Sequence, residues 1–172
     1  MVGVPRWGVA LAIALLAAAL GLGSVLGLAT STETRYAEMG REMRETGDYV
    51  VPRFDGAPRL EKPPLAMWAI AGSIAALGEN DVAARVPSLV AGLLTMLVVA
   101  AAARRLSFAS ERVERSRFAF VVLGTMPGFL LQAYVVSTDA WLALFVALAG
   151  WALLEAERAR GRRSTRDERT PA

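Results

Sequence analysis

Four long runs of apolar residues divide the chain, and each is long enough, or nearly so, to cross a membrane as a helix. They cover residues 7–29, 82–103, 118–136 and 140–156. A membrane-spanning helix needs about 20 predominantly apolar residues, so the first three runs qualify and the fourth is slightly short. The pattern predicts an all-α integral membrane protein with about four transmembrane helices.

A fifth apolar run, residues 65–78, is shorter and follows Pro63-Pro64. Short loops rich in arginine stay in the cytoplasm, so the positions of the arginines test whether this run crosses. If it crossed, the loop at 104–117 and the C-terminal tail would both lie outside. If it lies along the membrane interface instead, both termini and that loop are cytoplasmic. We therefore predict a large outer loop, residues 30–81, that contains amphipathic interfacial helices.

The two ends of the chain complete this topology. We interpret the first run as a span and not as a cleaved signal peptide, because it is longer than a typical signal-peptide core and no clear A-x-A site follows it. Residues 157–172 are rich in arginine and predict a disordered cytoplasmic tail. The transmembrane module is thus expected to comprise residues 1–156, with the multi-pass chain lying in a bacterial inner membrane.

Composition supports this class and excludes several others. The chain has 172 residues, of which 55% are hydrophobic, and its mean hydropathy is +0.41. It contains no cysteine and no histidine, which excludes disulfides, thiolate zinc sites, a cysteine nucleophile and a histidine base. Its arginine clusters directly adjoin apolar runs, which favours a role in topology over nucleic-acid binding.

The start of the outer loop predicts a helix. Residues 30–33, Thr-Ser-Thr-Glu, form a capping-box pattern in which a hydroxyl residue is followed three positions later by Glu. Gly47 is a natural stop. Between them an apolar stripe recurs at helical spacing, so this helix is expected to lie flat on the membrane surface; the stripe consists of Tyr36, Met39, Gly40 and Met43.

The next segment predicts a hairpin followed by a second helix start. Residues 49–54 and 57–60 flank Asp55-Gly56, a tight-turn signal. Pro63-Pro64 then favours the first turn of the helix that continues through Trp68. Lys62 would lie beside the free N–H groups at that helix terminus, where a phosphate binds well. The alternative is that Lys62 only snorkels to the interface and pairs with Glu61.

Three further features lie near the predicted spans. Asp139 precedes the last run, where it either caps the helix or is a functional carboxylate facing a shared cavity. Asp81 and Arg85 are interpreted as the cap and an interface anchor of the second span. The break at residues 125–128, Thr-Met-Pro-Gly, predicts a kink in the third.

Three ordered motifs carry a resemblance to a known superfamily. They are "ETRYAEMGREM" from residue 33, "GDYVVPRFDGAPRLEKPPLAMW" from residue 47 and "NDVAARVPSLVAGLL" from residue 80. The chain resembles the N-terminal part of the GT-C glycosyltransferases that use polyprenyl-phosphate sugars. Within these it is most similar to the group containing the bacterial aminoarabinose transferases that modify lipid A, related to the protein O-mannosyltransferases. The similarity runs from about Trp7 to Leu154.

The resemblance implies roles for six residues in an active site that faces away from the cytoplasm. Lys62 would hold the lipid phosphate, and Glu61 would bind a divalent cation, as in some members. The remaining implied roles concern the sugar, donor or acceptor: Glu33 and Asp139 as catalytic residues, and Arg35 and Tyr36 as substrate-binding residues.

The sequence also departs from the family pattern. The family has Asp-Glu before x-Arg-Tyr, but here Thr32 replaces the Asp, and a hydroxyl cannot replace a carboxylate as a general base. The histidine partners expected for a cation are absent. Family members are several times longer, so the chain is expected to be the first third of such an enzyme.

These observations lead to two functional hypotheses. In the first, the chain is a glycosyltransferase module, inactive alone, that takes sugar from a polyprenyl-phosphate donor to a lipid or protein acceptor. A second polypeptide would then supply the missing helices. In the second, it is a non-catalytic membrane subunit or degenerate remnant that retains lipid-phosphate binding. Membrane lipids are expected partners in both, and nucleic acid in neither.

Overall fold

The computed structural model describes residues 31–107 and 112–167, with side chains to residue 161, and six isolated positions nearer the N-terminus. The predicted span at 7–29 lies outside the described residues apart from those isolated positions. The elements are α2 (Ser31–Thr46), β1 (Arg53–Phe54), β2 (Ala57–Pro58), α3 (Leu65–Leu77), α4 (Asp81–Leu106), α5 (Arg112–Thr125), α6 (Pro127–Tyr134) and α7 (Asp139–Asp167).

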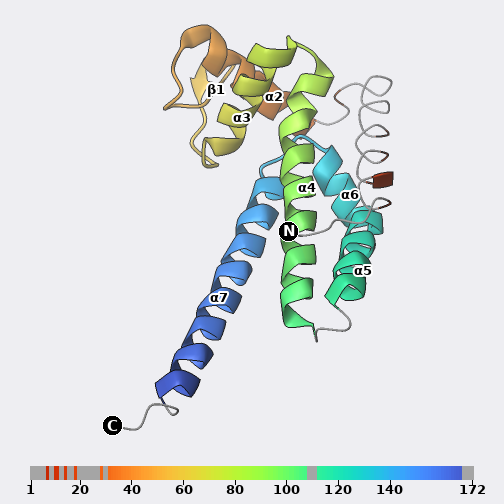
Figure 1. The fold of residues 1–172 in the computed structure, drawn as a ribbon. Helices are drawn as coiled ribbons and strands as arrows, with labels where there is room; N and C mark the ends of the chain where they lie inside the picture. The colour runs from red at the N-terminus through yellow and green to blue at the C-terminus, as the bar shows by residue number, and fades with distance from the viewer. Residues whose placement is uncertain are drawn as a thin grey trace.

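The described elements form two parts. Helix α2, the hairpin β1–β2 and α3 gather at one end of the long helix α4, and we call residues 31–77 the polar lobe (Figure 1). Helices α5, α6 and α7 run beside α4 and form the apolar part. Helix α3 packs on both α2 and α4, so the short fifth apolar run is part of the lobe, and its place at the membrane interface stays a prediction.

The apolar helices fit a membrane by length and composition. Within the described residues, α4 and residues 139–161 of α7 are long and apolar enough to cross, and α5 with α6 becomes a third span if the bent pair is counted as one. The bend between α5 and α6 is 67°. This bend confirms the predicted break at 125–128. Its cause is Pro127, which begins α6 and cannot donate a backbone hydrogen bond.

Small side chains allow the spans to approach one another. A Cβ atom on Gly92 of α4 would lie only 2.6 Å from the Cβ of Ala133 on α6, so the absence of a side chain at 92 permits this contact. Ala91 of α4 packs against Ala140 and Leu144 of α7. The arrangement places the first turn of α7 against the first half of α4.

The end of α7 differs from the prediction. We expected the last span to end at residue 156 and a disordered tail to follow, but the helix continues to Asp167. The Glu155 carboxylate lies 3.6 Å from the Arg105 guanidinium, which also lies over the Trp151 ring at 5.8 Å. These contacts hold α7 to the end of α4 and favour helical continuation past the apolar run.

The polar lobe confirms the first predicted helix but changes its surroundings. Helix α2 ends before Gly47, whose φ is +71° and whose N–H donates to the Met43 carbonyl at 3.0 Å. Met39 and Met43 are buried against Ala66 and Met67 of α3. The apolar stripe therefore contacts protein, and the expectation that the helix lies flat on the membrane surface stays a prediction.

The predicted hairpin and its turn are confirmed, although its strands are shorter than the predicted 49–54 and 57–60 and cover Arg53–Phe54 and Ala57–Pro58. Asp55 and Gly56 both have positive φ, 51° and 72°, which is the backbone of the type I′ turn that suits the twist of two paired strands. Phe54 pairs with Ala57 across the turn. Asp55-Gly56 is one of the few dipeptides that adopt this conformation at little cost, so local sequence determines the turn.

The predicted cap of α4 is corrected. The side chain of Asn80, and not of Asp81, accepts the N–H of Ala83 at 2.8 Å. Asp81 occupies the first helical position, where its charge is favourable near the helix N-terminus. Arg85, expected to anchor the helix at the membrane interface, is instead buried in the protein.

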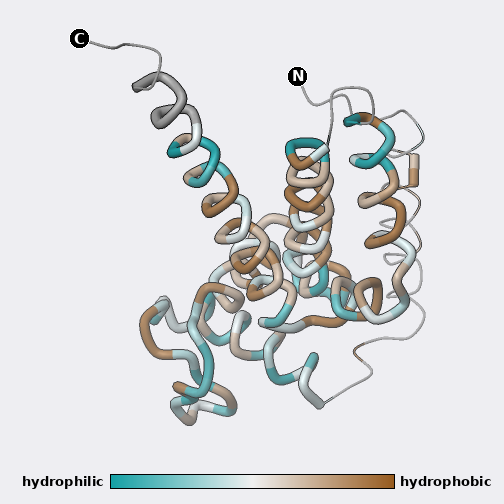
Figure 2. Tube along the Cα trace, turned by 90° about the horizontal axis from the view of Figure 1, so that it is seen from below, coloured by the Kyte–Doolittle hydropathy of each residue, from teal (hydrophilic) through white to brown (hydrophobic). Residues whose placement is uncertain are grey.

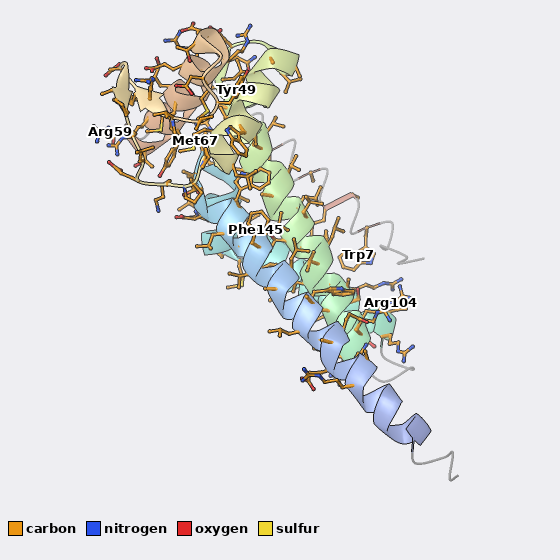
Figure 3. All side chains as sticks on the ribbon, turned by 90° about the vertical axis from the view of Figure 1, so that its left-hand side faces the viewer. Trp7, Tyr49, Arg59, Met67, Arg104 and Phe145 are labelled. Carbon is orange, nitrogen blue, oxygen red and sulfur yellow. The ribbon has the colours of Figure 1, made fainter. Side chains whose placement is uncertain are left out.

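Lys62 and Arg112 test the predicted topology, because they lie near opposite ends of α4. Figure 3 shows Arg59 and Met67, which bracket Lys62 in sequence, at one end, and Arg104 at the other. The native chain has no cysteine, so Lys62→Cys and Arg112→Cys each give a single thiol. We expect a membrane-impermeant maleimide to label position 62 in intact cells and position 112 only after permeabilisation. Labelling of both positions in intact cells would contradict this topology.

Candidate functional site

Glu33 forms a buried ion pair with Arg85, although it lies in the first turn of a surface lobe. Its Oε1 atom is 3.3 Å from Nη2 of Arg85, and the two side chains are 2% and 1% exposed. Burial of two charges is costly unless they are paired and hydrogen-bonded. The pair therefore joins α2 to α4 in one defined arrangement.

The same carboxylate also holds the loop that precedes α7. The N–H of Val136 donates to Glu33 Oε1 at 3.3 Å. The next residue, Ser137, donates its N–H to the Ser88 hydroxyl of α4 at 3.4 Å. Residues 135–138 are thus attached to α2 by Glu33 and to α4 by Ser88.

Arg85 extends this network to α6. Its guanidinium carbon lies 4.8 Å from the centroid of the Tyr134 ring, a cation–π geometry. Tyr134 is the last residue of α6, so the buried arginine also contacts the end of that helix. The Glu33–Arg85 pair consequently connects α2, α4, α6 and the loop before α7.

Asp139 is the first residue of α7, and its side chain is exposed. Thr138 precedes it and accepts the N–H of Leu142 at 3.1 Å through its carbonyl. The Asp139 N–H donates to the Ser137 hydroxyl at 3.2 Å, which also accepts from Gln132 at 2.7 Å. Neighbouring residues therefore provide the helix-start contacts, and the Asp139 carboxylate faces solvent at the positive end of the helix dipole.

Lys62 is exposed two residues before the Pro64 that precedes α3. The alternative interpretation paired it with Glu61, but the Glu61 carboxylate lies 3.1 Å from Arg59 instead. Among the residues that the structure describes, Lys62 has no carboxylate partner. Its ammonium therefore remains available beside a helix start whose prolines cannot donate backbone hydrogen bonds.

Trp141 attaches the first turn of α7 to the polar lobe. It packs against the lobe's core cluster, which consists of Met39, Met43, Ala66, Met67 and Ala71. It also lies two positions after Asp139. The helix start that carries the exposed Asp139 is thus packed against the lobe that carries the exposed Lys62.

The other predicted site residues have separate environments. Thr32 is exposed and Arg35 is partly exposed, whereas the Tyr36 ring packs on the cores of the polar lobe. Glu33 therefore points inward while its neighbour Thr32 faces outward. The position where the family has Asp is open to solvent, but here it offers only a hydroxyl.

The described residues do not form a metal site on their own. Nowhere in residues 31–107 and 112–161 do three Asp or Glu side chains gather as they would around an ion. Glu61, which the resemblance implies as a metal ligand, pairs with Arg59. A divalent cation at Glu61 would need further ligands from elsewhere, and its presence stays a prediction.

Sequence reasoning missed the importance of Arg85 and Ser88. Both lie within a predicted span, in the stretch "AARVPS", and both are buried. The available signal was the arginine itself, because an ionisable residue inside an apolar run usually faces a partner within the protein. Its partner, Glu33, is 52 positions away, and no local pattern connects the two.

The sequence profile of the dolichyl-phosphate-mannose-protein mannosyltransferase family matches residues 61–165. The chain belongs to this family. The match includes Lys62, Arg85 and Asp139 but begins after Glu33. The polyprenyl-phosphate glycosyltransferase resemblance carried by the sequence motifs is therefore confirmed.

Individual relatives agree with this assignment. The undecaprenyl phosphate-alpha-4-amino-4-deoxy-L-arabinose arabinosyl transferase of Pseudomonas aeruginosa is 36% identical over 139 residues, which are 80% of this chain and 25% of the relative. The protein of the same name from Pseudomonas savastanoi is 33% identical over 138 residues, again 80% and 25% of the two chains.

A solved structure has the same fold. The crystal structure of ArnT from Cupriavidus metallidurans, bound to undecaprenyl phosphate, superposes with a TM-score of 0.77 at 28% identity. The similarity covers 86% of this chain and 26% of ArnT. The chain thus spans about a quarter of the length of the relatives that it matches.

The Glu33–Arg85 pair generates a stability prediction. Glu33→Ala removes the carboxylate that faces the buried guanidinium, so we expect a loss of about 3–5 kcal/mol in stability. Thermal unfolding of the detergent-solubilised protein, followed by circular dichroism, measures this loss. Glu45→Ala on the exposed face of the same helix serves as the control, because its ion pair with Arg41 is half exposed and contributes at most about 1 kcal/mol.

The double variant Glu33→Leu with Arg85→Met separates the pair from the packing. Because both charges are removed together, we expect it to recover most of the lost stability. Equal unfolding temperatures for Glu33→Ala and Glu45→Ala would show that the buried pair does not hold the lobe.

Proposed function

We propose that this chain provides the lipid-phosphate-binding part of a polyprenyl-phosphate-dependent glycosyltransferase. The sugar would pass from the polyprenyl-phosphate donor to a lipid or protein acceptor on the outer face of the membrane. The supporting observation is that the polar lobe, which carries the exposed Lys62, packs against Trp141 in the first turn of α7, the helix that begins at the exposed Asp139. Family membership and the undecaprenyl phosphate bound to ArnT support the same donor class.

Each exposed group has a chemical role in this proposal. The bond from the sugar to the phosphate breaks as the acceptor attacks, and negative charge accumulates on the departing phosphate. The Lys62 ammonium would stabilise that charge. The Asp139 carboxylate would orient the acceptor hydroxyl or amine and accept its proton.

Glu33 would act indirectly in this arrangement. Its carboxylate is buried and paired with Arg85, so it does not reach an acceptor in the described conformation. It would position the residues on either side of it, Thr32 and the loop before Asp139. Arg35 remains a candidate for binding the donor, because it lies on the same helix and is partly exposed.

The proposed function requires the polar lobe to lie on the outer side of the membrane. Four spans, with both termini in the cytoplasm, would place the polar lobe on the outer face of a bacterial inner membrane. The described helices supply α4, α7 and the α5–α6 pair as three of these. The N-terminal run at 7–29 would supply the fourth.

A second candidate is a membrane subunit that binds lipid phosphate without transferring sugar. Two observations favour it specifically. Thr32 stands where the family has a carboxylate, and the Glu33 carboxylate is paired with Arg85. Lipid-phosphate binding at Lys62 would be unchanged in such a subunit. The two candidates therefore share the binding step and differ in the chemistry.

Binding of undecaprenyl phosphate tests the shared step. Lys62→Ala should weaken its binding to the purified chain in detergent by about tenfold or more, because a hydrogen bond to a charged group contributes about 1.5–3 kcal/mol. Microscale thermophoresis measures this affinity. Undecaprenol, which lacks the phosphate, should bind weakly to both the unaltered chain and the Lys62→Ala variant.

Arg44→Ala is the matched control for this binding experiment. Arg44 is another exposed cation of the polar lobe, but it lies near the far end of α2 and pairs with Glu79 at 2.6 Å. The Arg44→Ala variant should bind undecaprenyl phosphate with the same affinity as the unaltered chain. An unchanged affinity in Lys62→Ala would remove Lys62 from the proposal.

Restoring the missing carboxylate tests the chemical step. Thr32→Asp places an acidic side chain at an exposed position, and sugar transfer from an undecaprenyl-phosphate-linked aminoarabinose to lipid A is followed by mass spectrometry. We expect transfer by Thr32→Asp to exceed that of the unaltered chain at least tenfold. Ser31→Asp, one position earlier on the same helix, controls for added charge.

The outcomes distinguish the two candidates. Transfer by the unaltered chain at the rate of Thr32→Asp would refute the non-catalytic view and the need for a carboxylate at 32. No transfer by any variant, together with Lys62-dependent binding, would show that the chain alone binds lipid phosphate without transferring sugar, either as a binding subunit or as a module that needs a second polypeptide.

A further inference from the structure

The polar lobe carries exposed large apolar side chains around its hairpin. Four of these side chains form a patch, and we call them the lobe patch: Tyr49, Val50, Leu60 and Trp68, which are 45%, 79%, 75% and 46% exposed. They come from the segment after α2, the segment after β2 and the first turn of α3. Exposed apolar side chains from separate segments that meet on one surface indicate a contact surface.

Backbone and side-chain hydrogen bonds bring these segments together. The indole N–H of Trp68 donates to the Tyr49 carbonyl at 2.6 Å. The N–H of Arg59 donates to the Pro52 carbonyl at 2.7 Å, which places Leu60 close to the chain that follows Val50. Hydrogen bonds between the segments therefore hold the patch residues in place.

The exposure of Val50 also has a local cause. The N–H groups of Val50 and Val51 donate to the Asp48 carboxylate at 3.1 and 3.2 Å. These bonds, from Val51 first and Val50 second, lower the pKa of Asp48, so the carboxylate stays ionised at neutral pH. The resulting turn directs a β-branched apolar side chain outward.

The stripes of the two lobe helices do not supply this surface. Met39 and Met43 of α2 are buried against Ala66 and Met67 of α3, so those faces are already covered by protein. Of the large apolar side chains in residues 47–68, those of the lobe patch are the most exposed. Any contact that the hairpin side of the lobe makes with an apolar medium must use the patch.

The position of the hairpin indicates which medium that is. Figure 2, which looks along the bundle from below, shows the hairpin beside the described helices and outside their footprint. Figure 1 shows that the lobe lies at the end of the bundle where α4 and α7 begin. A bilayer that holds α4 and α7 would have its surface near this end of the bundle.

The chemistry of the patch fits the interfacial zone of a membrane. Trp and Tyr concentrate at the level of the lipid headgroups because one end of each ring is apolar and the other polar. Lys62 lies two residues from Leu60 and has no carboxylate partner among the described residues, so its ammonium can reach lipid phosphates while its stem follows the apolar surface. Charge and apolar area are therefore combined as in interfacial membrane contacts.

We propose that the lobe patch inserts into the interfacial zone of the bilayer that holds α4 and α7, and so fixes the depth of the polar lobe. The occupant is lipid: headgroups around Lys62 and the upper acyl chains around Val50 and Leu60. Helices α2 and α3 then attach to the membrane through this patch and not through their apolar stripes.

Single-cysteine fluorescence tests this proposal in the complete chain, which has no native cysteine. Val50→Cys and Leu60→Cys are labelled with an environment-sensitive NBD fluorophore and reconstituted in vesicles of phosphatidylcholine and phosphatidylglycerol. Lipids that carry a spin label near the headgroup should quench both probes at least twofold, and aqueous iodide should quench them weakly. Glu45→Cys, on the charged face of α2, should show the reverse pattern.

Two results would overturn the proposal. Iodide quenching at positions 50 and 60 as strong as at 45 would place the patch in water. Protection from both quenchers would show that protein covers the patch, either a second copy or another polypeptide.

A second variant keeps the test independent of the probes at the two sites. Leu60→Glu introduces a charge into the patch, so lipid quenching of the probe at position 50 should fall at least twofold. Thr46→Glu adds the same charge at an exposed position outside the patch and should leave that quenching unchanged. Circular dichroism confirms that both variants are folded, and equal quenching in the two would contradict the role of Leu60.

Discussion

The arrangement of the described structure depends on one buried ion pair, Glu33 with Arg85. Removing two charges from water costs several kcal/mol for each ion, so such a pair is poor as a source of stability alone. Its value lies in the number of elements that it fixes. The Glu33 carboxylate accepts from Val136 and faces Arg85, whose guanidinium covers Tyr134. An apolar contact would permit sliding, whereas these directional contacts set one register between the polar lobe and the spans.

This pair divides the polar residues into those that hold the scaffold and those that are open to a ligand. Glu33 and Arg85 are buried, while Lys62 and Asp139 are exposed at the starts of α3 and α7. A catalytic carboxylate must reach its substrate, and a positioning carboxylate must not. Adjacent residues on α2 show the distinction: Thr32 faces outward, where the family has an acid, and Glu33 faces the interior. Because Glu33 is buried against Arg85, its carboxylate does not reach the surface at position 32.

The sequence predicted those features that depend on neighbouring residues. Asp55-Gly56 requires a tight turn, Gly47 ends α2, and Pro127 breaks the third span, because each acts through its own backbone. The family motifs identified Lys62 and Asp139 as candidate site residues. The partner of the α2 stripe and the pairing of Arg85 could not be predicted, since both depend on how segments distant in sequence meet. Helical periodicity shows that a stripe will be buried but not whether lipid or α3 will cover it.

The depth of the lobe relative to the membrane connects the patch to the chemistry. A polyprenyl-phosphate keeps its chain in the bilayer and its phosphate at the level of the headgroups, so a cation that receives it must lie at that level. Leu60 lies two residues before Lys62, and Trp68 lies in the helix that follows it. Insertion of these apolar side chains would hold the ammonium where the phosphate arrives laterally, and Trp141 would keep Asp139 close to the same height. A soluble phosphate would need no such anchor, so the proposed insertion of the patch fits a ligand that is itself a lipid.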